Sequence, residues 1–126
     1  MTLDLITLKK LAIISIFAVL FGTAAIDKLK TLSVPAWFIK QFESTLIAKL
    51  PGGVSLGYWM IASLEFTLFA GFLLAIVWPM LLPLALTGSL FLFAALCFGL
   101  RLASDFQGSA NMFIYFASTL ISLSAI

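Results

Sequence analysis

Histidine is absent from this chain of 126 residues, and cysteine occurs once, as Cys97. The absence of histidine removes the commonest metal ligand and proton shuttle, and with them a haem held by histidine. A single cysteine excludes an internal disulfide and a CxxC redox pair, and its apolar neighbours indicate a buried small hydrophobe. We therefore predict no metal site and no evident cofactor motif, and the sequence identifies no catalytic residue.

Charged residues are scarce as well: they make up 10% of the chain, and none occurs from Phe66 to Leu100. Hydrophobic residues make up 63%, and the mean hydropathy is +1.24. A soluble domain of this size could not cover so much apolar surface, so the composition indicates an integral membrane protein in contact with the lipid bilayer. The net charge of +2 is carried by scattered side chains and gives no sign of a nucleic-acid surface.

Prolines divide the apolar sequence into membrane spans. Trp78-Pro79 and Pro83 interrupt the longest uncharged run, so two antiparallel helices are expected to meet there at a tight turn. We predict four spans, at about residues 7–29, 54–77, 80–101 and 106–126. Because irregular backbone cannot face lipid, residues 1–126 are expected to form one membrane domain, an all-α bundle of four transmembrane helices.

The first span admits a second interpretation. Lys9-Lys10, an apolar run and then Thr23-Ala24-Ala25 also describe a secretory signal peptide with its cleavage site. Against cleavage, small residues share one helical face, which suits close packing of neighbouring helices. These residues are Ser15, Ala18, Gly22 and Ala25. We favour a retained span.

The hydrophilic segment between the first two spans predicts an amphipathic helix of about four turns, over residues 35–50. Pro35 suits its first turn, Ser33 is available as a cap, and Pro51-Gly52-Gly53 ends it. Its apolar side would hold Phe38, Ile39, Phe42, Leu46 and Leu50, and Lys40, Gln41, Ser44 and Thr45 would lie on another side. Such a helix lies at the membrane interface with Trp37 at headgroup level, as a lid, a docking face or a simple connector.

Glu65 is the leading functional clue. A helix from Phe66 to Trp78 would span only about 20 Å, against the roughly 30 Å of a bilayer core. The second span must therefore begin near Ser55, which brings Glu65 to mid-membrane. An ionisable group at that depth faces the bundle interior or water, not lipid.

Depth along the spans suggests partners for this carboxyl. Counting inward from the end where Asp105 lies, Tyr115 is level with Glu65, and Asn111 is one turn shallower. A buried carboxyl without a cation stays protonated, because desolvation disfavours its charged form. We therefore hypothesise a neutral Glu65, hydrogen-bonded to Tyr115 or Asn111. The alternative is an ion pair with Lys28 or Arg101, whose long side chains could reach inward.

Three further contacts are expected. Arg101 and Asp105 stand four residues apart, which suits a local ion pair. The polar residues of the fourth span share one face, which should point inward; they are Asn111, Tyr115, Ser118 and Ser122. On the second span, Ser63, Thr67 and Gly71 form a close-packing stripe beside a face that comprises Tyr58, Ala62, Glu65, Phe69 and Phe72.

Lysine and arginine counts bear on membrane orientation. The N-terminal head carries two, and the two connections on the opposite face carry five. The positive-inside rule would place those connections in the cytoplasm and both termini outside. If Lys28 and Arg101 belong to an internal site, five becomes three, and the orientation stays open.

Three stretches resemble the DoxX family of small four-span bacterial membrane proteins. They are FGTAAIDKL at residues 21–29, LEFTLFAGFLL at 64–74 and RLASDFQGSANMFIYF at 101–116. The related MauE type carries a cysteine-containing segment before its fourth span, where this chain has Asp105-Phe106-Gln107-Gly108. The resemblance implies a multi-pass protein of the bacterial inner membrane, with Lys28, Glu65 and, less closely, Arg101 at the family's recurring charged positions.

The resemblance also implies a role as an accessory subunit of a quinone-linked membrane oxidoreductase system. A quinone could lie in an aromatic-walled pocket near Glu65, although phenylalanine also serves as bulk filling between helices. The alternatives are a non-catalytic structural or assembly subunit of a larger membrane complex, and a small transporter in which Glu65 is a proton or substrate site. A membrane protein partner or a homo-oligomer is expected in each case.

Overall fold

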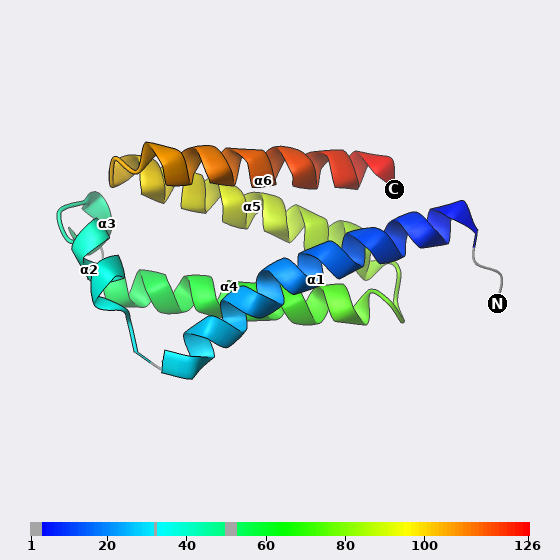
Figure 1. Ribbon diagram of the computed structural model, residues 1–126, viewed down its shortest axis with the longest axis horizontal. Helices are drawn as coiled ribbons and strands as arrows, with labels where there is room; N and C mark the ends of the chain where they lie inside the picture. The colour runs from blue at the N-terminus through cyan, green and yellow to red at the C-terminus, as the bar shows by residue number, and fades with distance from the viewer. Residues whose placement is uncertain (1–3, 32, 50–52) are drawn as a thin grey trace.

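The computed structural model describes residues 4–31, 33–49 and 53–126, and all regular secondary structure in these ranges is helical. The helices are α1 (Leu5–Thr31), α2 (Ala36–Phe42), α3 (Leu46–Lys49), α4 (Gly53–Leu74), α5 (Leu81–Leu102) and α6 (Phe106–Ala125). In Figure 1, α1, α4, α5 and α6 run along the molecule, with α2 and α3 at one end and the start of α1 and the end of α6 at the other. The prediction of an all-helical protein is confirmed.

Three of the described helices, α1, α4 and α5, are long and apolar enough to cross a membrane. Their outward faces carry large exposed apolar side chains, among them Ile16, Leu64, Phe66, Leu84, Phe91 and Phe98. Such a surface suits acyl chains and not water. Helix α6, with 20 residues, lacks comparable hydropathy because polar residues interrupt it.

Helix ends follow local chemistry. The Thr7 N–H donates to the Asp4 carboxylate at 2.7 Å, which caps α1 and lowers the pKa of the Asp4 carboxyl. Helix α4 ends at Leu74, three residues before the predicted end at residue 77, and a turn leads to Pro79. Pro83 lies in the first turn of α5, where a missing N–H costs nothing.

The segment between α1 and α4 differs from the prediction of one helix over residues 35–50. It forms two short helices, α2 and α3, and the N-cap of α2 is Pro35, not Ser33. The backbone N–H and hydroxyl of Thr45 both bond to the Phe42 carbonyl, at 3.1 and 2.7 Å, so the helix tightens and stops. Leu50, Pro51 and Gly52, the predicted end of this helix, lie outside the described residues.

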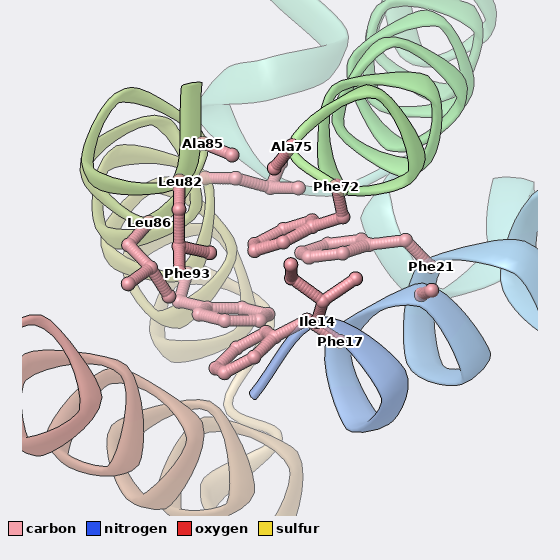
Figure 2. Close-up of a cluster of buried hydrophobic side chains, with 11 residues drawn as sticks. Ile14, Phe17, Phe21, Phe72, Ala75, Leu82, Ala85, Leu86 and Phe93 are labelled. Atoms are coloured by element: carbon pink, nitrogen blue, oxygen red, sulfur yellow. The ribbon is translucent and has the colours of Figure 1, made fainter. Parts of the chain in front are cut away.

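The core is a stack of aromatic rings between α1, α4 and α5 (Figure 2). The Phe17 and Phe72 ring centroids lie 5.1 Å apart with an interplanar angle of 12°, and Phe21 stacks on both Phe72 and Phe93. Leu82 and Leu86 of α5 close the cluster and are fully buried. Phe17, Phe21, Phe72 and Phe93 therefore fill the space between helices. This agrees with the interpretation that phenylalanine serves as bulk filling.

Small residues bring α1 close to α4. Ala18, Gly22 and Ala25 are buried, as predicted, whereas Ser15 is exposed. A Cβ atom on Gly22 would lie 2.8 Å from the Phe69 ring, so this ring occupies the space that any larger residue at position 22 would need. Close approach of these two helices positions the charged residues described next.

A buried ion pair beneath an aromatic cavity

Lys28 and Glu65 form an ion pair inside the bundle. Lys28 lies in the last turn of α1 and Glu65 in the middle of α4. The Lys28 Nζ donates to Glu65 Oε1 at 2.9 Å and to Oε2 at 3.1 Å. The side chains are 21% and 7% exposed, respectively, so the pair is largely removed from solvent.

Helix geometry explains why this lysine reaches the carboxylate. From the contact of Gly22 with Phe69, Lys28 lies six residues towards the C-terminus of α1, about 9 Å along the axis. Glu65 lies four residues towards the N-terminus of α4, about 6 Å along an antiparallel axis. Helical side chains lean towards the N-terminus of their own helix, so the lysine stem runs back into the bundle and covers the difference.

The hypothesis of a neutral Glu65 bonded to Tyr115 or Asn111 is wrong about the partner. Both Glu65 carboxylate oxygens accept a hydrogen bond from the Lys28 ammonium. Tyr115 packs on Phe93 with ring centroids 5.7 Å apart, and the Asn111 side-chain Oδ1 accepts a hydrogen bond from Gln107 Nε2 at 3.4 Å. Equal depth did not bring the groups together because α4 packs against α1 and α5, whereas α6 packs mainly on α5.

The polar face predicted to point inward on α6 is not buried, and Asn111 and Ser122 are half-buried. Tyr115 and Ser118 are exposed, and the buried hydroxyls of α6 belong to Ser109 and Thr119. On α4, Tyr58, Glu65 and Phe72 are buried as predicted. Of the predicted close-packing stripe, Ser63 and Thr67 are exposed, and only Gly71 approaches α5.

Arg101 and Asp105 lie apart from the ion pair and from each other. The Arg101 guanidinium lies 5.0 Å from the centroid of the Phe106 ring. The Asp105 carboxylate accepts the Gly108 N–H at 2.9 Å, as the N-cap of α6, and the Gln41 side chain at 3.0 Å. The predicted Arg101–Asp105 pair is wrong, because the helix ends at Leu102 and Ser104, with φ of 60°, turns the chain away from helical spacing.

A cavity of about 540 Å³ opens beside the ion pair. Its lining includes Lys28, Glu65 and Asp27, together with Ala24, Pro35, Trp37, Phe38, Tyr58, Ile61, Leu96 and Met112. Helix α2 forms one wall, and the Phe38 ring meets Tyr58 edge-on at 5.0 Å. The Lys28 Nζ lies 5.8 Å from the centroid of the Tyr58 ring. We call this space the head cavity.

The sequence did not identify several of these lining residues as members of a site. Trp37 and Phe38 were assigned to a surface helix, and Ile61, Leu96 and Met112 were ordinary apolar positions of spans. No local signal marks such residues, because walls of apolar pockets and helix cores share one composition. Asp27, which directly precedes Lys28, also lines the cavity and was not named as a candidate from the sequence.

The head cavity combines charge with aromatic walls. A bound carbonyl or hydroxyl could exchange hydrogen bonds with the ammonium or the carboxylate, and a flat ring could lie among Trp37, Phe38 and Tyr58. No group of three histidine, cysteine, aspartate or glutamate side chains gathers as metal ligands in the part of the chain that the structure describes. The arrangement suits an organic ligand that is polar at one end.

Comparisons with known proteins identify no relative, so the interpretation of this site depends on its geometry. No protein-family model matches the chain, and neither a curated protein nor a solved structure matches it.

Proposed function

We propose that the chain is a DoxX-like, multi-pass protein of a bacterial inner membrane, with α1, α4, α5 and α6 as four spans. Helix α6 supports the fourth span, since its 20 residues carry no charge and would extend about 30 Å, the thickness of a bilayer core. Both termini then lie on one side of the membrane (Figure 1), and α2 with α3 lies at the opposite interface.

The proposed activity is binding of a quinone-type head group, in an accessory subunit of a membrane oxidoreductase. The observation that carries this proposal is the Lys28–Glu65 pair at the wall of an aromatic cavity of about 540 Å³. Quinone carbonyls accept hydrogen bonds, and the flat ring suits aromatic walls. In this proposal the electrons come from a partner chain, the redox enzyme that the accessory subunit accompanies.

Tryptophan fluorescence tests ligand binding directly. Trp37 lines the head cavity, so in a Trp59→Phe/Trp78→Phe background a bound short-tailed quinone should quench Trp37 emission in nanodiscs. Ala24→Phe places a ring in the cavity and should weaken binding about tenfold or more. Ala12→Phe, at an exposed position of the same helix, is the matched control and should leave affinity unchanged. Absence of saturable quenching, or equal affinity in Ala24→Phe, would refute the proposal.

Purification from native membranes tests the accessory role. The proposal expects a redox enzyme to copurify, with quinone in the lipid extract. Recovery of a stable assembly that survives loss of Glu65 and holds no quinone would favour the structural role. Recovery of a homo-oligomer alone would favour a transporter.

A further inference from the structure

Helices α1 and α6 border a second, open cavity. In Figure 1, α1 crosses the bundle obliquely, and its N-terminal end lies closer to α6 in this view than its C-terminal end does. Between the two helices lies a cavity of about 410 Å³, with Leu20 and Thr23 on one wall and Tyr115, Ser118 and Ser122 on the other. We call this space the lateral groove.

Helices α1 and α6 both contribute residues to the lateral groove and to the head cavity. We call the boundary between these two helices the seam. On α1, Ala24 lines the head cavity and Thr23, its neighbour in the chain, lines the lateral groove. On α6, Met112 lines the head cavity, and Tyr115, about one turn further, lines the groove. From Met112 to Ser122 the seam therefore runs about 15 Å along α6.

Polarity falls along this seam. The head cavity holds Asp27, Lys28 and Glu65, whereas none of the described residues that line the lateral groove is charged. The Thr23 hydroxyl donates to the Val19 carbonyl at 2.8 Å, and the Ser122 hydroxyl to the Ser118 carbonyl at 2.9 Å. The Thr23 and Ser122 hydroxyls therefore donate to their own helices, and Ile16, Phe17, Val19 and Leu20 make one wall of the groove apolar.

We infer that the two cavities hold a single molecule, with a polar, hydrogen-bond-accepting head beside Lys28 and Glu65 and one long hydrocarbon tail in the lateral groove. This inference rests on the proposed function and defines the ligand class more closely. An isoprenoid quinone and a single-chain lipid share this chemistry. The two cavities have lining residues from neighbouring positions of α1 and α6, charged residues in one and uncharged residues in the other, and this arrangement favours a head with a tail over a head group alone.

Photocrosslinking locates the tail. The probe is a quinone with a diazirine at the end of its tail, added in stoichiometric amount to the full chain in nanodiscs. Crosslinks should fall on residues 16–23 and 115–122, and a roughly tenfold excess of unlabelled long-tailed quinone should lower their yield about tenfold. In Ser118→Phe these crosslinks should be lost, whereas quenching of Trp37 by a short-tailed quinone stays unchanged. Ser124→Phe, at an exposed position of α6, is the matched control and should keep both signals.

The outcomes separate the two proposals. Crosslinks spread over lipid-facing residues such as Phe66 and Phe91, without competition, would overturn the tail site even if Trp37 is quenched. If the short-tailed quinone does not quench Trp37, the quinone proposal fails, and a diazirine-labelled lysophospholipid then decides whether a lipid uses the same seam. Specific groove crosslinks from that lipid would support the inference, and their absence would end it. If Ser118→Phe does not fold, Ser122→Leu, one turn deeper, gives the same readout.

Discussion

Lys28 has its backbone near the end of α1 but its side chain reaches into the bundle. Its backbone lies in the last turn of α1, but its ammonium bonds to a carboxylate that is 7% exposed. Removing one member of a buried pair costs about 3–5 kcal/mol, whereas replacing both with apolar residues is often tolerated. The pair therefore fits a specific role in positioning or binding more readily than a role in stability alone.

At the same scale, Gly22 is expected to be intolerant of substitution. Gly22→Ala should destabilise the protein by about 1–3 kcal/mol, because the new Cβ would lie 2.8 Å from the Phe69 ring. Gly71→Ala is the matched control: its Cβ would lie 3.8 Å from that of Ala85, and helix propensity favours alanine. Thermal unfolding in one detergent measures both. Equal stability of the two variants would contradict the close approach of α1 and α4.

The sequence predicted that Glu65 points into the bundle but not which residue it meets. Depth can be counted along a chain, and that count made Tyr115 and Glu65 level. The choice of partner depends on which helices adjoin, and no residue pattern in a single sequence reports this. Lys28 was the less favoured candidate because its backbone lies near the membrane edge, where an ammonium can reach water.

At the scale of elements, Asp105 links two parts of the fold. It caps α6 through Gly108 and holds α2 through the Gln41 side chain. A Cβ on Gly108 would lie 2.6 Å from the capping carboxylate, so glycine leaves room for this cap. The link fixes the helix that forms one wall of the head cavity.

Two substitutions separate these roles. Asp105→Ala should cost about 1 kcal/mol from the lost cap and should also release α2. Gln41→Leu should release α2 while leaving the cap and most of the stability intact. Hydrogen exchange of α2 amides and thermal unfolding measure the two effects. If α2 exchange is unchanged in both variants, the hydrogen bond does not hold the helix.

The short helices show where element prediction fails. The apolar spacing from Phe38 to Leu50 predicted one continuous helix, but Thr45 bonds back to the Phe42 carbonyl and splits it. The long helices were predicted well because Pro79, Pro83 and the charged turns mark their ends. On α6, three residues of the predicted polar face, Tyr115, Ser118 and Ser122, line the lateral groove beside α1.

At the scale of the whole molecule, the site affects the orientation argument. Arg101 is exposed and contacts Phe106, so it does not belong to the internal pair. Only Lys28 is then withdrawn from the charge count, which leaves four cations (Lys30, Lys40, Lys49 and Arg101) near the α2 end against Lys9 and Lys10. The positive-inside rule now favours one orientation.

We predict that the α2 end lies in the cytoplasm and both termini lie outside. In a Cys97→Ala background, a cysteine added after Ile126 should react with a membrane-impermeant maleimide in intact cells. A cysteine at Ser44 should react only after lysis. The reverse pattern would contradict this orientation.

The most direct test of the account is a double-mutant cycle on the ion pair, with unfolding free energies measured in one lipid or mixed-micelle system. Lys28→Met and Glu65→Gln should each destabilise the protein by about 3 kcal/mol, because each leaves a buried partner unpaired. The double variant should recover about 1–3 kcal/mol relative to the sum of the single changes. A Glu65→Gln protein as stable as the wild type, with no coupling to position 28, would show that the charged pair does not form in the membrane.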